Sequence, residues 1–423
     1  MKCLSLFNCF VILFLISFLS CNNHKENTGD LPQIKLCLTK DLLKNVYASE
    51  FISNIEYIPL ETSEQSLIKF TDMDISDNYI LVKGEPYMLF SRQGKFIRHI
   101  GSVGQGPGEY SSVSDFYIYE KSSMIYLSND YEIFAFRISG EFFKKLDLRE
   151  FCKKLGIPKL WKIVHWKDDI FCANIDLNSG KELYTFVVFT LDGEVVKLFP
   201  NYMTFDKEIR FHSNYAFAEI YKHNGLVSNK RAISDTIFRL TDQLEMVPDV
   251  YFDLCGRSPS KMPISSIFDS YTSISFINEV GNYILFGCSF GNITPSDLPS
   301  MQFCIYDRNS TNLIFCKGDP FSRKPPRVLP NGELLQRNSA SDYYSGFIND
   351  IDGGLPFWTD LIRLQNKQQL AMTYQPSVML GNLTEEYFSA HEIKDIQAHE
   401  RLKKLLENLE EDDNPVLMIA TFK

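Results

Sequence analysis

Sequence motifs of the common catalytic and metal sites are missing from this 423-residue chain. Its seven histidines form no H-E-x-x-H pair, and no G-x-S-x-G nucleophile turn is present. None of the ten cysteines forms the C-x-x-C spacing that is typical of zinc and redox sites. The chain therefore carries no catalytic motif, and no cofactor is expected.

An excess of basic residues is also missing. Lys and Arg number 43, Asp and Glu number 53, and the formal net charge is −10. Proteins that bind nucleic acids normally present a basic face, often with interleaved aromatic side chains. No such cluster occurs here, so no nucleic-acid partner is expected.

Long apolar runs are limited to the N-terminus, where one extends from Leu4 to Leu19. A bilayer span needs about 20 apolar residues, so this shorter run is typical of a secretory leader. It ends in Phe18-Leu19-Ser20-Cys21 and is followed by polar residues. This end resembles a lipoprotein signal, which implies that Cys21 is lipidated. Ordinary cleavage beside an unmodified cysteine, and a retained membrane helix, remain alternatives.

The predicted organisation follows from this leader. Residues 1–20 form a lipoprotein signal peptide, residues 21–45 a lipid-anchored tether and entry segment, and residues 46–423 one propeller. We expect an outer-membrane lipoprotein of the cell envelope that contacts the membrane through its N-terminal lipid. The residues after Cys21 are not rich in acidic side chains, which slightly favours a periplasm-facing anchor over a surface-facing one.

Aromatic residues are plentiful, at 14% of the chain, and they favour β-structure. A unit of apolar strand, turn, second strand, glycine turn and third strand recurs about six times. The clearest copies run over Tyr79–Ile100, Met124–Leu146 and Asp169–Phe199, and the last spans Leu355–Tyr374. Repeats of roughly 40 to 70 residues are typical of propeller blades. The sequence therefore predicts an all-β, six-bladed β-propeller.

Two terminal segments and one helix complete this prediction. Asn54–Leu60 and Pro415–Ala420 are strand-like, and we expect them to join in one blade that closes the ring. Leucines at helical spacing between Glu392 and Glu411 predict a C-terminal amphipathic helix. It is expected to pack on the outside or at one mouth of the ring, and partner binding is the alternative.

Cys288, Cys304 and Cys316 each lie in an apolar run. Free cysteine is among the most buried residue types, so we expect buried thiols that act as small hydrophobes. A disulfide among the three remains open, because export leads to an oxidising compartment.

Three segments, Gly101–Tyr110, Ser234–Arg239 and Asn349–Trp358, resemble those of the six-bladed β-propeller lipoproteins of Bacteroides-type gut bacteria, which are NHL-like in shape. The resemblance implies the fold and export but no activity. Asp235-Thr236-Ile237 also fits a pattern that is O-glycosylated on exported proteins of such bacteria. The alternative is that Thr236 is simply a strand residue.

Two glycine-containing segments provide the candidate ligand site. The first contains Gly104, Gln105, Gly106, Gly108 and Glu109; it lacks the Lys-Ser/Thr of a phosphate loop and is interpreted as an inter-blade loop at the mouth of the channel. The second contains Asp350 and Asp352, which could cap a turn or hold calcium through their oxygens.

These patterns lead to two functional hypotheses. The first is a binding or scaffolding module for a glycan, a peptide or an envelope protein. The second is a metal-dependent hydrolase or lyase whose site lies at the mouth of the channel. In that case Glu109, Asn129, Asp130, Asp350 and Asp352 could line a calcium site, as in lactonase-type propellers.

Overall fold

The computed structural model describes most of the chain after the leader. The described residues are 31–37, 43–177, 181–202, 204, 219–223, 225–231, 234–258, 272–290, 301–317, 346–358, 362–366 and 368–423, and the backbone of 321–322, 327–328, 334–335 and 343–344. Cys21 and the rest of the leader therefore lie outside the described residues.

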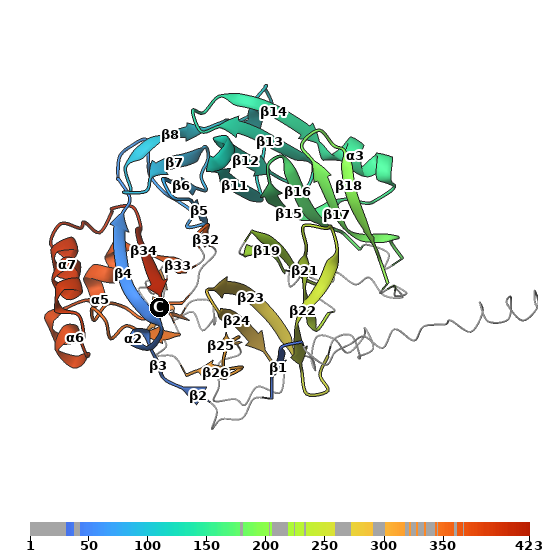
Figure 1. Cartoon of the computed structure of the whole chain (residues 1–423). Coiled ribbons are helices and arrows are strands. Elements are labelled where there is room, and N and C mark those ends of the chain that lie inside the picture. The colour runs from blue at the N-terminus through green and yellow to red at the C-terminus, as the bar shows by residue number, and fades with distance from the viewer. Residues whose placement is uncertain are drawn as a thin grey trace, which may run out of the picture.

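Six small sheets are arranged in a ring, as Figure 1 shows, and the predicted six-bladed β-propeller is confirmed. Blade 1 consists of β5 (Met73–Ile75), β6 (Tyr79–Val82), β7 (Tyr87–Ser91) and β8 (Phe96–Ile100). Blade 2 consists of β11 (Asp115–Tyr119), β12 (Met124–Ser128), β13 (Glu132–Arg137) and β14 (Phe142–Asp147). Blade 3 consists of β15 (Leu160–Lys167), β16 (Ile170–Ile175), β17 (Tyr184–Thr190) and β18 (Val195–Pro200).

The remaining blades follow the same order around the ring. Blade 4 consists of β19 (Glu219–His223), β20 (Leu226–Lys230), β21 (Thr236–Leu240) and β22 (Met246–Asp253). Blade 5 consists of β23 (Ser273–Val280), β24 (Tyr283–Ser289), β25 (Met301–Asp307) and β26 (Leu313–Cys316). Blade 6 combines β33 (Gln369–Tyr374), β34 (Val416–Phe422) and β4 (Ile52–Pro59).

Burial decreases from the inner strands to the outer ones. All five residues of β12 are buried, because both faces of blade 2 are covered by its neighbours. The outer strand β18 instead exposes Val195, Val196 and Lys197. The apolar runs of the sequence are therefore the middle strands, and the mixed runs are the outer ones.

The predicted closure of the ring is confirmed. β4 and β34 pair antiparallel from Pro59 opposite Val416 to Ile52 opposite Phe422, and β34 also pairs with β33. The last strand of the chain is thus the middle strand of blade 6, between a strand from the start of the propeller and one from its end.

The sequence interpretation of the last repeat is wrong in one detail. The segment around Ile362 was assigned to the sixth unit, but β32 (Ile362–Leu364) pairs in parallel with β5 of blade 1. Arg363 donates a 2.6 Å hydrogen bond to the carbonyl oxygen of Phe116 in β11. β32, which directly precedes β33 of blade 6 in the sequence, therefore lies at the inner edge of blade 1 and contacts blade 2.

The N-terminal segment runs along the outer edges of two blades. β1 (Gln33–Lys35) adds in parallel to β22, and β2 (Leu43–Lys44) adds in parallel to β26. A disulfide between Cys37 and Cys255 fastens β1 to blade 4. The described part of the segment expected as tether and entry therefore contributes edge strands to the propeller.

Short elements fill the connections. The two-stranded sheets pair β3 (Val46–Tyr47) with β31 (Phe347–Ile348), β9 (Ser102–Val103) with β10 (Glu109–Tyr110), β27 (Phe321–Ser322) with β30 (Tyr343–Tyr344), and β28 (Arg327–Val328) with β29 (Leu334–Leu335). Outside the C-terminal region, the described residues form the helices α2 (Ala48–Phe51) and α3 (Leu148–Leu155) and the 3-10 turn η3 (Glu120–Ser122).

The predicted C-terminal helix is present as α7 (Ile396–Leu406), which begins after the capping side chain of Asp395. Two helices that the sequence analysis did not predict, α5 (Pro376–Asn382) and α6 (Glu385–Ala390), precede it. All three lie on the outer side of blade 6 (Figure 1), and Leu402 is fully buried in the same core as β33 and β34. No described helix is long and apolar enough to cross a membrane.

The cysteines of the described residues give a first prediction. Cys288, Cys304 and Cys316 are buried free thiols, and burial raises the pKa of the Cys304 thiol well above its usual range. We expect maleimide to leave these three unmodified in the folded protein and to label them after unfolding, since the thiolate is the reactive form. Peptide mapping by mass spectrometry should recover Cys37 linked to Cys255. Rapid native labelling of Cys304, or a free Cys37 without reductant, would contradict this assignment.

Candidate functional site

Strand ends of blades 3 and 4 meet on one face of the ring. β15 begins and β16 ends at this face, and β19 begins and β20 ends there as well. In a ring of antiparallel sheets, the connections from each outer strand to the next inner strand run across this same face. We call it the connection face. α3, which links β14 to β15, lies on it.

A pair of buried amides joins the two blades at this face. Asn229 at the end of β20 donates a 2.8 Å hydrogen bond from Nδ2 to Oδ1 of Asn174 at the end of β16. The two side chains are only 3% and 6% exposed. Among the described residues, the remaining atoms of the pair, Asn229 Oδ1 and Asn174 Nδ2, have no hydrogen-bond partner. Whichever way the amides are oriented, one donor and one acceptor are left over.

Trp161 adds a third buried atom without a partner. It lies opposite Asn174 in the pairing of β15 with β16, so both side chains leave the sheet on the same face. The ladder is irregular after Trp161, where Lys162 has a φ of 52°. Its indole Nε1 is buried and makes no hydrogen bond within the described structure. The ammonium of Lys159 lies 5.6 Å from the centre of the indole ring.

One cation borders this group of amides. Arg231, directly after β20, donates a hydrogen bond to Thr185 Oγ1 at the start of β17. Burial lowers the pKa of the Arg231 guanidinium. The preceding Lys230 leaves β20 on the other face, opposite Ile237 of the core between blades 4 and 5. Burial lowers the pKa of the Lys230 ammonium to about 8. We refer to Trp161, Asn174, Thr185, Asn229 and Arg231 as the junction site.

Buried hydrogen-bonding atoms without partners are rare in native proteins and call for an explanation, such as a bound ligand or water. Other such atoms among the described residues lie elsewhere in the ring; for example, Tyr87 Oη belongs to blade 1 and Tyr306 Oη to blade 5. The junction site contains three such atoms, on β15 and β16 of blade 3 and on β20 of blade 4. It can therefore offer two donors and one acceptor to a polar molecule.

The glycine loop predicted from the sequence lies at the boundary of blades 1 and 2, away from the junction site. Its Glu109 carboxylate accepts a 2.8 Å hydrogen bond from the amide of Gly106, which closes the turn. Gly108, at a φ of 76°, packs against Phe142 in the outer strand β14. Gly104 donates its amide to Tyr110, and Gln105 is exposed. A ligand role for this loop stays a prediction.

Asp350 and Asp352 lie beside α7 and do not contact the glycine loop. Asp350 is paired with Lys394 at 2.6 Å and accepts bonds from the amide and hydroxyl of Ser49. Asp352 accepts a 2.8 Å bond from the amide of Gly354, and burial raises the pKa of its carboxyl. These contacts are those of turn-capping side chains. Calcium binding remains a prediction.

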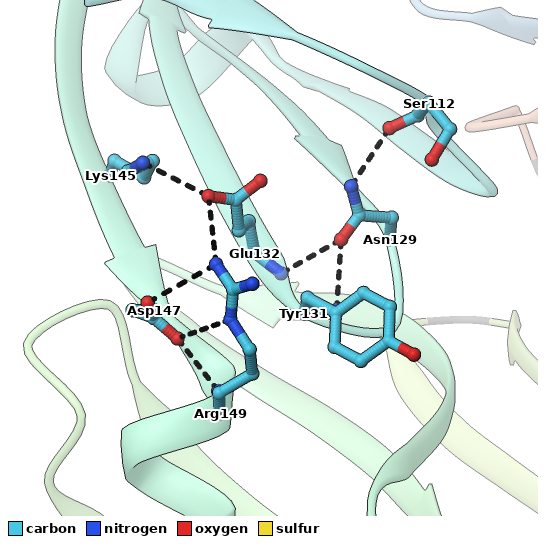
Figure 2. Close-up of polar contacts among 7 residues, drawn as sticks. All are labelled: Ser112, Asn129, Tyr131, Glu132, Lys145, Asp147 and Arg149. Atoms are coloured by element: carbon cyan, nitrogen blue, oxygen red, sulfur yellow. Dashed lines mark hydrogen bonds and ion pairs between the residues drawn. The ribbon is translucent and has the colours of Figure 1, made fainter. Parts of the chain in front are cut away.

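The Asn129 turn of blade 2 is satisfied by its own backbone (Figure 2). Asn129 Oδ1 accepts the amides of Tyr131 and Glu132, and its Nδ2 donates to the carbonyl of Ser112. Beside the turn, Glu132 is paired with Lys145 at 2.9 Å. The neighbouring Asp130 is paired with Lys159 at 3.1 Å. The arrangement fixes the turn rather than leaving atoms free for a ligand.

No group of three or more His, Cys, Asp or Glu side chains is placed to hold a metal ion in the described parts of the chain. Thr236 opens β21, is partly exposed, and donates its amide to Ser234 Oγ. Its glycosylation, the lipidation of Cys21 and the metal-dependent hypothesis are not tested by these contacts and stay predictions.

The junction site was not predicted from the sequence. Its best signal is Ser228-Asn229-Lys230-Arg231, four polar residues that directly follow the apolar start of β20. Polar residues at the buried end of a strand are unusual unless they are paired. The pairing across blades could not be read from one strand alone.

Comparison with known proteins places the chain in a family. Residues 31–421 match the model of the domain of unknown function DUF4934. The chain belongs to this family. No curated protein matches it.

Two solved structures align with the chain. A Bacteroides fragilis protein inferred to be exported aligns with 93% of this chain and 100% of its own, at 16% identity and a TM-score of 0.58. A member of the duf4221 family from Bacteroides vulgatus aligns with 62% of this chain and 84% of its own, at 13% identity and a TM-score of 0.43. At such identities, the first likeness concerns the fold alone.

Proposed function

We propose that this DUF4934 propeller is an exported, lipid-anchored binding module whose ligand occupies the junction site. The single observation that carries the proposal is the grouping of Trp161 Nε1, Asn174 Nδ2 and Asn229 Oδ1, all buried and all without a partner among the described residues. A bound polar ligand would remove the cost of leaving these atoms unpaired.

The ligand that suits these atoms best bears hydroxyl groups. A hydroxyl both donates and accepts, so one hydroxyl can bond to Asn174 Nδ2 and Asn229 Oδ1 together. A glycan therefore fits the site better than an apolar molecule. Of the ligand classes considered, glycans match this donor and acceptor pattern most directly, and peptides or envelope proteins are the alternatives.

Several features support export and anchoring. The apolar leader ends at Cys21, and the Cys37–Cys255 disulfide is a bond typical of oxidising compartments. The similar Bacteroides fragilis protein is itself inferred to be exported. We place the protein at the outer membrane of the cell envelope, held there by lipid on Cys21.

The binding proposal is tested with a panel of oligosaccharides presented to the purified protein. We expect Asn174→Ala and Asn229→Ala to weaken binding of any saccharide found by about 10-fold, since each removes a hydrogen-bonding atom of the ligand site. Trp161→Phe removes the indole N–H but keeps an aromatic ring and should weaken binding less. Isothermal titration calorimetry measures each affinity.

Asn408→Ala is the matched control, because Asn408 is an exposed amide near the end of α7. Thermal unfolding of each variant reports whether the ring is intact. Saccharides that bind with the same affinity to all four variants and the parent protein would show that the ligand lies elsewhere. Failure of every saccharide on the panel would remove the glycan assignment.

The anchoring proposal is tested by Cys21→Ala. We expect this variant to move from the membrane fraction to the soluble fraction, because stable anchoring needs the acyl chains. Cys9→Ala, in the leader, should leave the distribution unchanged. Mass spectrometry of the mature N-terminus identifies the lipid, and an unchanged membrane fraction for Cys21→Ala would contradict the assignment.

A further inference from the structure

Arg231 at the edge of the junction site is a cation without an anionic partner in the described structure. In the described structure its side chain makes one hydrogen bond, to the neutral hydroxyl of Thr185. No described carboxylate forms an ion pair with the guanidinium. A guanidinium carries five donors, so most of its donors remain unused.

Lys230, the residue before Arg231, carries a second positive charge, but its side chain lies on the other face of blade 4, opposite Ile237. Its ammonium makes one long hydrogen bond, 3.4 Å to the carbonyl oxygen of Arg231, and it forms no ion pair in the described structure. The side chain is buried, with 3% exposure. Buried charges are normally paired, because removing an ion from water without compensation is costly.

The neighbouring junction shows how this chain treats cations that serve the fold alone. Between blades 4 and 5, Arg239 contacts Glu279 at 2.6 Å and Asp249 at 3.0 Å. Arg308 contacts the same two carboxylates at 3.0 Å and 2.7 Å. That network pairs every guanidinium with carboxylates, whereas the guanidinium between blades 3 and 4 has none. No described carboxylate pairs with Arg231, so an acidic group of a ligand would find its donors free.

We infer that the ligand of the junction site is an acidic saccharide, whose carboxylate binds Arg231 while its hydroxyls bind the Asn174–Asn229 pair. This inference rests on the proposed binding function and adds the charge of the ligand to it. The planar fork of Arg231 suits a carboxylate in two-point contact. The Trp161 side chain leaves the sheet on the same face as Asn174 and would offer an aromatic surface to the sugar ring.

The test compares acidic and neutral saccharides of equal length on the purified protein. Trigalacturonate is the acidic probe, α-1,4-linked galactotriose is its neutral counterpart, and a sulfated galactose trimer separates sulfate from carboxylate recognition. Triglutamate tests whether the charge alone suffices. We expect trigalacturonate to bind at least about 10-fold more tightly than galactotriose, and triglutamate not to compete.

Substitution of Arg231 tests whether its guanidinium is responsible for the preference for the acidic trimer. Arg231→Gln should weaken trigalacturonate binding by about 10- to 100-fold and leave galactotriose binding unchanged, since only the charged contact is lost. Arg231→Lys should recover part of the affinity because the charge returns without the fork. Lys197→Gln, at an exposed lysine of β18, removes one positive charge elsewhere and should change neither affinity.

The outcomes separate the two proposals. The acidic assignment is wrong if acidic and neutral trimers bind equally, or if Arg231→Gln still prefers the acidic trimer to the same extent. In either case, weaker saccharide binding by Asn174→Ala and Asn229→Ala would still support the proposed binding site. Tighter binding of the sulfated trimer than of trigalacturonate would contradict recognition of a carboxylate. Competition by triglutamate would contradict the assignment of the ligand as a saccharide. If Asn174→Ala binds trigalacturonate as tightly as the parent protein, the ligand does not occupy the junction site.

Discussion

The structure depends on the burial of both faces of each short sheet against the neighbouring blades. Strands such as β12 and β17 are apolar on both sides, and neither could be stable in a sheet exposed to water. Each blade therefore needs two neighbours, and an open ring would expose two apolar faces. β34 supplies the last contact, because it ties the start of the propeller to its end.

Ring packing also decides where polar chemistry can occur. The middle of each blade is filled by side chains, for example Cys172, Phe186 and Val227 between blades 3 and 4. Polar residues of the inner strands are therefore concentrated toward the strand ends, where two blades meet at a face of the ring. One such junction is closed by Arg239, Arg308 and their carboxylates, and the other leaves donors without partners among the described residues. The same architecture thus holds one junction that is paired internally and one at which we propose that a ligand binds.

The fold could be predicted because its evidence is local and repeated. Apolar strands with turns such as Asp192-Gly193, where the glycine has a φ of 78°, recur along the chain, and the two terminal strands are apolar enough to be recognised as a pair. The fold and the closure of the ring follow from that pattern. α5 and α6 were missed because each is short and was hidden between two strands of one blade. β32 was misplaced because parallel pairing with a strand nearly 290 residues earlier leaves no local pattern.

The candidate site could not be predicted for the same reason. Asn174 and Asn229 are separated by 55 residues, and nothing in either strand indicates that their amides meet. Asp350 and Asp352 were selected from the sequence because they lie beside glycines, but their carboxylate oxygens contact Ser49, Lys394 and Gly354. Polar residues beside glycines often stabilise turns. Candidate binding atoms are recognised in the structure as buried polar atoms without hydrogen-bond partners.

Native-state hydrogen exchange of the full-length protein measures whether the whole ring depends on its closure through β34. We expect the amides of Val416–Phe422 to exchange among the slowest in the chain, and only through global unfolding, because β34 is bonded on both sides and buried. Exchange of these amides through local opening, well before the amides of β12 and β17, would contradict it.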